Sequence, residues 1–269
     1  MIDSDTRRRL RAQDIGFYTV FATISATYVL LILLLLGADA LSTSPREFFR
    51  ALAKPPIQYS ILLTMASCTI SAIASMWVAI PVGYLLSRHK FPGRSLVDAI
   101  LDIPIVLPPL VIGLSLLILF QFWPFSLISG AVVYQIPAVI LAQFTVACAF
   151  AVRTMRATFD QIDPRHEQVA LTLGASRMMA FLLVVLPEAR RGMLTALTLA
   201  WARALGEFGP LLIFAGTTRM KTEVLSTSVF LELTIGDLEA AIAVSLLMVL
   251  AAVVVLVIAR VWGTREVLT

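Results

Sequence analysis

The chain has 269 residues, of which 59% are hydrophobic and 14% are charged, and its mean hydropathy is +0.91. A soluble domain carries about 25% charged residues, so this composition excludes a water-exposed globular fold and indicates a membrane protein. Two cysteines are too few for a disulfide framework or a four-ligand zinc site, and no metal is expected. The net charge of +4 is carried by segments between apolar runs, which argues for membrane orientation and against nucleic acid.

Long stretches without Asp, Glu, Lys or Arg predict the membrane-spanning helices, because about 20 residues cross a hydrocarbon core. The 50 uncharged residues from Ile103 to Val152 are too many for one crossing, and a tight turn is predicted at Gln121–Gly130, where Pro, Ser and Gly gather. The prediction is a single all-α domain over residues 1–269 with six transmembrane helices, at about 15–38, 59–87, 100–121, 131–152, 192–217 and 239–261.

The segments between these spans differ in positive charge. Those on the side of the two termini carry 15 Lys and Arg, including Arg7, Arg8, Arg9, Arg11, Arg260 and Arg265, whereas those on the other side carry 5. The positive-inside rule therefore predicts a multi-pass protein of the plasma (inner) membrane with both termini in the cytoplasm.

The N-terminal segment has an alternative interpretation as a cleaved signal peptide, because it is basic and Ala38-Asp39-Ala40 has the small-x-small form. Its apolar stretch of 24 residues exceeds the roughly 7 to 15 of such peptides, which favours a first span. Residues 45–54 are predicted to form a short helix at the outer interface, since Phe and Leu alternate there with charged side chains.

The inner loop at 153–191 is far longer than a turn between adjacent helices needs. Asp163 and Pro164 begin a helix well, because Asp caps free N–H groups and Pro at the first position loses no hydrogen bond. Gly174 suits the left-handed residue that ends a helix. A second apolar stretch, Met178–Leu186, is predicted to end at Pro187. The pattern predicts two short helices hinged at Gly174, with a functionless hairpin at the membrane surface as the alternative.

The spacing of this loop resembles the EAA loop of permeases in ATP-binding-cassette importers. Gln168-Val169-Ala170, Gly174 and Val184-x-Leu186-Pro187 fit four family positions, with Gln168, Val169 and Val184 in place of Glu, Ala and Ile. The resemblance implies a coupling helix that docks on a nucleotide-binding subunit. The residues it assigns to this contact are Asp163, Pro164, Glu167, Gln168, Ala170, Leu173, Gly174 and Ala175.

Two further segments are similar to permeases for molybdate. One is the run 202–209 followed by Phe214-Ala215-Gly216, and the other is the proline-rich segment 102–109 with Gly113. The resemblance implies the type I importer permease fold and a path for a tetrahedral oxyanion, molybdate or tungstate, with sulfate and related anions left open. It also implies a second copy of the chain, two cytoplasmic ATP-binding subunits and an extracytoplasmic solute-binding protein. No phosphate-binding loop occurs in the chain, so ATP and Mg²⁺ are expected on the partner and no cofactor here.

Two charges stand inside the fifth predicted span. Arg203 and Glu207 are four residues apart, so they can pair on one helix face, and burying either alone in lipid is costly. A structural ion pair is therefore favoured over a direct contact between Arg203 and the solute. Prolines break membrane helices where protein or water covers the break. The predicted wall of the path comprises Pro104, Pro108, Pro109, Arg203, Gly206, Glu207 and Gly209.

Enzymatic functions are disfavoured by the residues present. His166-Glu167 begins a His-Glu-x-x-His zinc motif, but Ala170 occupies the second histidine position. The prediction is therefore a transport subunit without an activity of its own. The alternative from another class is a secondary ion-coupled transporter, which a titrating Glu207 would favour and the long inner loop disfavours.

Overall fold

The structure is a computed structural model that describes the backbone of residues 4–264 and the side chains of residues 16–257. Within that range it is helical, and no strand occurs between residues 4 and 264. The six terminal arginines that enter the orientation argument lie outside the described side chains. The all-α fold class is confirmed.

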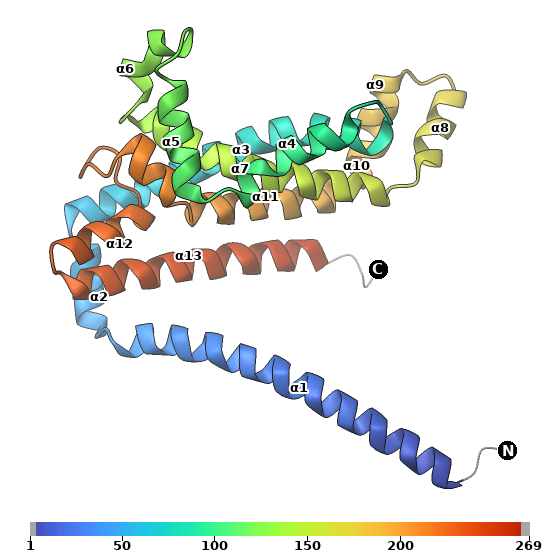
Figure 1. Cartoon of the computed structure of the whole chain (residues 1–269), viewed down its shortest axis with the longest axis horizontal. Coiled ribbons are helices and arrows are strands. Elements are labelled where there is room, and N and C mark those ends of the chain that lie inside the picture. The colour runs from blue at the N-terminus through green and yellow to red at the C-terminus, as the bar shows by residue number, and fades with distance from the viewer. Residues whose placement is uncertain (1–3, 265–269) are drawn as a thin grey trace.

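Five long helices follow the long axis of the molecule in Figure 1. They are α1 (Ser4–Leu41), α3 (Pro55–Arg88), α7 (Ile136–Gln161), α11 (Arg190–Leu205) and α13 (Leu238–Thr264). Four of them, α1, α3, α7 and α13, are long and apolar enough to cross a membrane. The helices α4 (Arg94–Val106) and α5 (Pro109–Leu119) are bent by 111° at their junction and give a fifth span if they are counted together as one broken helix.

The predicted fifth span, 192–217, is not a continuous helix. It consists of α11, a break over residues 206–210, and the π-helical turn η3 (Leu211–Ala215). Gly206 ends α11, and Pro210 has no N–H to continue the hydrogen-bond ladder. By length and composition alone, the described residues therefore give four spans, or five with the bent pair, where the sequence predicts six.

Other boundaries also differ from the predictions. Charged residues at 153–160 were assigned to the inner loop, but α7 continues to Gln161, and Arg156 pairs there with Asp98 of α4. The loop therefore begins near Ile162. Instead of a tight turn, residues 120–135 contain the 3-10 helix η1 (Phe125–Ile128) and the short helix α6 (Ser129–Val132).

The core of the bundle is formed by α3, α7 and α11. Gly83 allows the close approach of two of these helices, because a Cβ there would lie 2.9 Å from the backbone nitrogen of Arg156. The N-terminal end of α3 packs with α2 (Pro45–Leu52), α12 (Leu225–Thr234) and α13 around Ile57 and Leu225. The apolar part of α1 has no buried residue in its most hydrophobic window.

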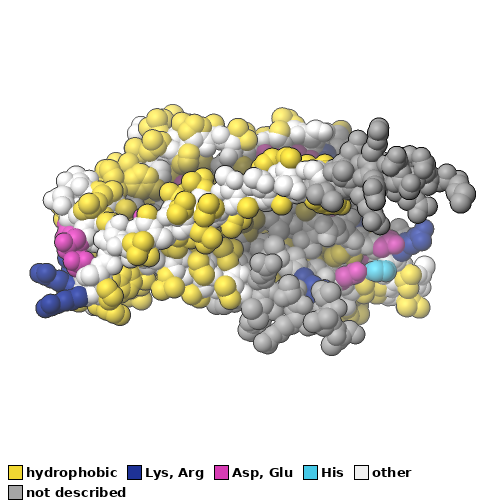
Figure 2. All heavy atoms as spheres, turned by 90° about the horizontal axis from the view of Figure 1, so that it is seen from below, with side chains coloured by type: hydrophobic (Ala, Val, Ile, Leu, Met, Phe, Trp, Pro, Cys, Tyr) yellow, Lys and Arg dark blue, Asp and Glu magenta, His cyan; other side chains and the backbone are white. Residues whose placement is uncertain are grey.

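The short helices gather at the two ends of the molecule. At one end lie α2, α6 and α12, and at the other lie α8 (Pro164–Thr172), α9 (Arg177–Ala180) and α10 (Leu186–Glu188) (Figure 1). The first residue of α1 and the last of α13 lie toward the end that holds α8. In Figure 2, hydrophobic side chains cover much of the described part of the face, and groups of charged side chains are visible at its left and right ends.

Candidate functional site

A cavity of about 290 Å³ lies where two membrane helices are interrupted. One interruption separates α4 from α5 at Leu107–Pro108, and the other separates α11 from η3. The cavity is lined by Pro108, Pro109, Leu110, Arg203, Gly206, Glu207, Phe208 and Gly209. The structure thus brings together every predicted wall residue except Pro104. That proline lies within α4, which continues to Val106, so the break comes later in the sequence than Pro104.

Two glycines fit against two prolines across this break. A Cβ at Gly209 would lie 2.7 Å from the Cβ of Pro109, and one at Gly113 would lie 2.7 Å from the Cα of Pro210. Distances below 3.0 Å require the backbone to shift. The broken ends of the two helices therefore pack directly on each other, and any larger side chain at either glycine would separate them.

Arg203 and Glu207 form the predicted pair at the cavity wall. Nη1 of Arg203 lies 2.9 Å from Oε2 of Glu207, and the Glu207 side chain is 1% exposed while that of Arg203 is 28% exposed. The Arg203 guanidinium also lies over the ring of Phe150, 5.6 Å from its centroid. The hydroxyl of Ser226 donates to the backbone carbonyl of Glu207 at 2.6 Å, which holds the turn after α11 in place. The guanidinium thus remains the accessible member of a neutralised pair.

The inner arm, residues 162–189, has the local structure expected for its first helix. The Asp163 side chain accepts a hydrogen bond from the backbone N–H of Arg165 at 2.9 Å, Pro164 is the first residue of α8, and Gly174 has φ +91°. The second part differs from the prediction, because the chain does not leave its helix at Pro187. The π-helical turn η2 (Phe181–Val185) leads into α10, which contains Pro187 in its first turn, where the missing N–H is tolerated.

The predicted coupling residues do not share one face of the arm. Gln168 is exposed, as are the apolar side chains of Val169 and Leu173, with exposed fractions of 56% and 83%. Glu167 instead points toward α3, where the hydroxyl of Tyr84 donates to it. Ala170 and Ala175 are partly covered. The exposed apolar side chains of Val169 and Leu173 form a surface suited to contact with a partner protein.

His166 also fastens α8 to the rest of the arm. Its Nδ1 lies 3.0 Å from Oε2 of Glu188 in α10. The hydrogen bond and the charge of Glu188 raise the pKa of His166 above its ordinary value. Protonation of the imidazole therefore strengthens this contact.

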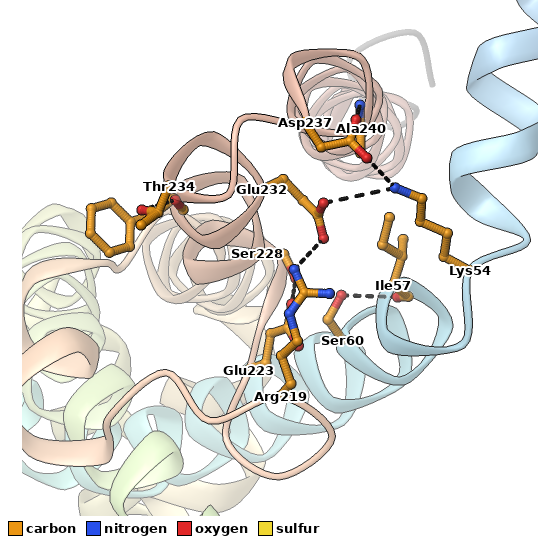
Figure 3. A network of polar contacts seen from close by, with 11 residues as sticks. Lys54, Ile57, Ser60, Arg219, Glu223, Ser228, Glu232, Thr234, Asp237 and Ala240 are labelled. Atoms are coloured by element: carbon orange, nitrogen blue, oxygen red, sulfur yellow. Dashed lines mark hydrogen bonds and ion pairs between the residues drawn. The ribbon is translucent and has the colours of Figure 1, made fainter.

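A polar network at the other end of the molecule was not predicted from the sequence (Figure 3). Nζ of Lys54 lies 2.5 Å from Oδ2 of Asp237 and 3.8 Å from Oε2 of Glu232, whose other oxygen lies 2.7 Å from Nη2 of Arg219. The hydrogen bond from Lys54 lowers the pKa of Asp237. Glu232 is 1% exposed, and the charges of Glu232 and Asp237 are offset by those of Lys54 and Arg219.

The same network holds the segment between η3 and α12. The buried Glu223 accepts a hydrogen bond from Oγ of Ser228 at 2.6 Å. The contacts of Arg219, Glu232 and Lys54 join this segment and α12 to the start of α3 and to the turn before α13. Glu223 and Glu232 are acidic residues in a largely apolar stretch, which was the available signal for a buried network.

Among side chains 16–257, no group of three or more His, Cys, Asp or Glu is placed to hold a metal ion. Cys68 and Cys148 are not bonded to each other. The interrupted helices around a small cavity with one accessible cation, within a bundle of apolar helices, are typical of a membrane permease.

The comparisons with known proteins identify the kind of permease. Residues 79–265 match the family described as binding-protein-dependent transport system inner membrane component, and the chain belongs to this family. The chain is 31% identical over 248 residues to the sulfate transport system permease protein CysT of Escherichia coli (strain K12), covering 89% of this chain and 90% of that protein. It is 33% identical over 202 residues to the molybdate/tungstate transport system permease protein WtpB of Pyrococcus abyssi, covering 74% and 78%.

A solved structure shares the fold. It is a bacterial ABC transporter involved in the import of the acidic polysaccharide alginate, with a TM-score of 0.73 at 17% identity, covering 98% of this chain and all of that chain. The predicted importer-permease fold is therefore confirmed, and the chain is a multi-pass membrane protein.

Proposed function

We propose that the chain is the transmembrane subunit of an ATP-driven importer and forms the path for a tetrahedral oxyanion, molybdate or tungstate. The observation that carries the proposal is the cavity between the broken helices, where Arg203 is the accessible cation in a wall that is otherwise apolar or paired. A dianion attracted to Arg203 must compete with Glu207, because the two anions repel each other at low dielectric. Contact with the path is therefore transient, and a transport path must release what it receives.

Selectivity in this proposal belongs mainly to an extracytoplasmic solute-binding protein. The exposed apolar side chains of α8 dock on a cytoplasmic ATP-binding subunit, which holds ATP and Mg²⁺, and this chain holds no cofactor. A second copy supplies the other arm, so that two arms meet two ATP-binding subunits around one pore. Both termini lie in the cytoplasm, on the side of α8, and the network around Lys54 lies outside. The chain itself performs no catalysis.

Sulfate is the second candidate solute, and the similarity to CysT over most of the chain favours it. Sulfate and molybdate differ in size and in the basicity of their oxygens. A solute-binding protein can distinguish these properties more readily than a transport path that binds the anion only weakly. The two candidates therefore differ in the partner rather than in the fold of this chain.

The test is uptake into proteoliposomes that contain this chain, its ATP-binding subunit and its solute-binding protein. We expect ATP-dependent uptake of radiolabelled molybdate that unlabelled tungstate suppresses and sulfate does not. Suppression by sulfate would instead assign the sulfate class. Uptake by this chain alone, driven by a proton gradient without ATP, would contradict the importer proposal and establish a secondary transporter. Calorimetry of the solute-binding protein with molybdate, tungstate and sulfate provides an independent measurement of the same selectivity.

A further inference from the structure

Glu167 is turned toward the membrane bundle and not toward the exposed face of the arm. Its Oε1 accepts a hydrogen bond of 2.6 Å from the hydroxyl of Tyr84, and its Oε2 lies 3.7 Å from Nε of Arg88. The Glu167 and Arg88 side chains are 14% and 10% exposed. The neighbouring Gln168 is exposed and lines the same cavity, so Glu167 is the polar side chain of α8 that is held against α3.

The last turn of α3 holds the arm at two points. Besides facing Glu167, Arg88 donates through Nη2 to the backbone carbonyl of Ile162 at 3.0 Å, where α7 ends and the arm begins. The Tyr84 ring is fixed edge-on against Phe181 of the arm and Phe159 of α7, with centroids 4.7 Å and 5.7 Å away. Its hydroxyl therefore has a defined position rather than a mobile one.

Beyond the contact of Tyr84 with Phe181, apolar packing does not fill the space between α3 and the arm. A cavity of about 780 Å³ lies there, lined on the α3 side by Ile80 and Leu85 and on the arm side by Leu171 and Met178. The helix α8 packs against η2 and α9, within the arm itself. The polar contacts of Glu167 cross the gap at one side of this cavity, so they fix the distance between α8 and α3 where apolar contacts do not.

We propose that Tyr84, Arg88 and Glu167 form a strut that makes α8 move with α3, and that Glu167 is a positioning residue for α8 rather than a contact for the ATP-binding subunit. This inference rests on the proposed function. A movement of the arm when the ATP-binding subunit closes is then transmitted to α3, which packs along α7 and α11 and so reaches the broken helix at the cavity of Arg203. Without the strut, the arm can move while the bundle stays at rest.

The test is a distance measurement between spin labels in the full complex in lipid nanodiscs. The spin labels are attached at Ala157 of α7 and Thr172 of α8, which are both exposed. The two native cysteines, Cys68 and Cys148, are first replaced by Ala so that only these positions are labelled. Tyr84→Phe keeps the aromatic contacts and removes only the hydroxyl. The matched control is Tyr59→Phe on the same helix, which removes a hydroxyl that donates to the Lys221 carbonyl at the other end.

We expect a roughly tenfold larger population of displaced α8 in Tyr84→Phe, the size of one lost hydrogen bond to a charged acceptor, and an unchanged distribution in the control. In Tyr84→Phe, the number of molybdate ions transported per ATP hydrolysed falls by a similar factor. Glu167→Gln, which keeps an acceptor for Tyr84 but loses the charge, gives an intermediate result.

A distribution that stays unchanged in both Tyr84→Phe and Glu167→Ala would overturn the strut, whatever the transport activity. If the labels separate as expected while uptake proves independent of ATP, the strut stands and the proposed function fails. If the labels stay in place while ATP-driven uptake is normal, the proposed function stands and the strut fails. The two proposals are thus tested separately.

Discussion

Arg203 and Glu207 lie one helical turn apart at the edge of a cavity, and their contact determines the charge that a passing solute meets. Breaking a pair of this kind leaves the remaining charge without compensation in a low-dielectric site, which typically costs about 3 to 5 kcal/mol. Removing both charges avoids that cost. The pair can therefore be tested by whether its two substitutions are additive.

We expect Arg203→Ala and Glu207→Ala each to lower the melting temperature and yield of the purified chain, and the double variant to recover part of both. The measurement is thermal unfolding of the three variants in one detergent. If Arg203→Ala is as stable as the parent but does not transport, while Glu207→Ala has no effect, Arg203 contacts the anion and the pairing interpretation is wrong.

His166 makes the inner arm sensitive to pH. Its pKa is raised in the folded state by Glu188, so the stabilisation is fully present below the ordinary pKa of a histidine and is lost as pH rises through the raised value. We expect limited proteolysis of the arm to become faster between about pH 6 and pH 8. A His166→Gln chain should show the fast rate at both values, and a parent chain with no such change would contradict this role.

The hinge of the arm depends on a conformation that side chains disfavour. Gly174 has φ +91°, and no atom lies within 4 Å of the position a Cβ would take, so a substitution there adds backbone strain without a clash. For Gly174→Val, a β-branched residue, the strain is about 1 to 2 kcal/mol. The bundle should fold normally, because α8 and α9 lie outside it.

We expect the Gly174→Val complex to bind its ATP-binding subunit poorly, or to hydrolyse ATP without responding to loaded solute-binding protein. Gly236→Val is the matched control, since Gly236 has φ +83° and equal space but lies at the opposite end, before α13. Co-purification and stimulated ATPase activity are measured for both. Normal coupling in Gly174→Val would show that this arm does not couple.

The break beside the cavity provides a second matched pair of glycines. A Cβ at Gly209 would meet Pro109 at 2.7 Å and the backbone nitrogen of Leu110 at 2.9 Å, whereas at Gly206 the nearest atom is 3.9 Å away. We expect Gly209→Ala to lose about 1 to 3 kcal/mol of stability and most transport, because two helix ends must separate. Gly206→Ala should be nearly neutral in thermal unfolding. An equal loss of stability in Gly209→Ala and Gly206→Ala would contradict the close packing of the two helix ends.

At the scale of the whole molecule, long uncharged stretches predicted most of the helices that form the bundle. The C-terminal end of α7 could not be predicted in the same way, because its charged residues suggest a loop although the helix continues to Gln161. Arg156 is paired there with Asp98. The break after Leu205 was also missed, since Gly and Pro are frequent within continuous membrane helices.

The pairing of Arg203 with Glu207 followed from a spacing of four, which sequence displays directly. The contacts of Glu167 with Tyr84 and of Lys54 with Asp237 join residues 83 and 183 apart in the sequence, and only the folded chain brings them together. Glu167 was placed among the coupling residues because it lies one place before the first position of the motif, but its side chain faces the bundle.

The exposed first helix has a consequence for biogenesis. Because none of the most apolar window of α1 is buried by the rest of the chain, and a helix satisfies its own backbone in lipid, α1 can enter the bilayer before the later helices are synthesised. We expect a chain starting at Ser44 to retain the melting behaviour of the α3–α7–α11 core but to insert inefficiently during translation. Protease protection of nascent chains in membrane vesicles measures this, and efficient insertion of the shortened chain would show that a later helix initiates entry.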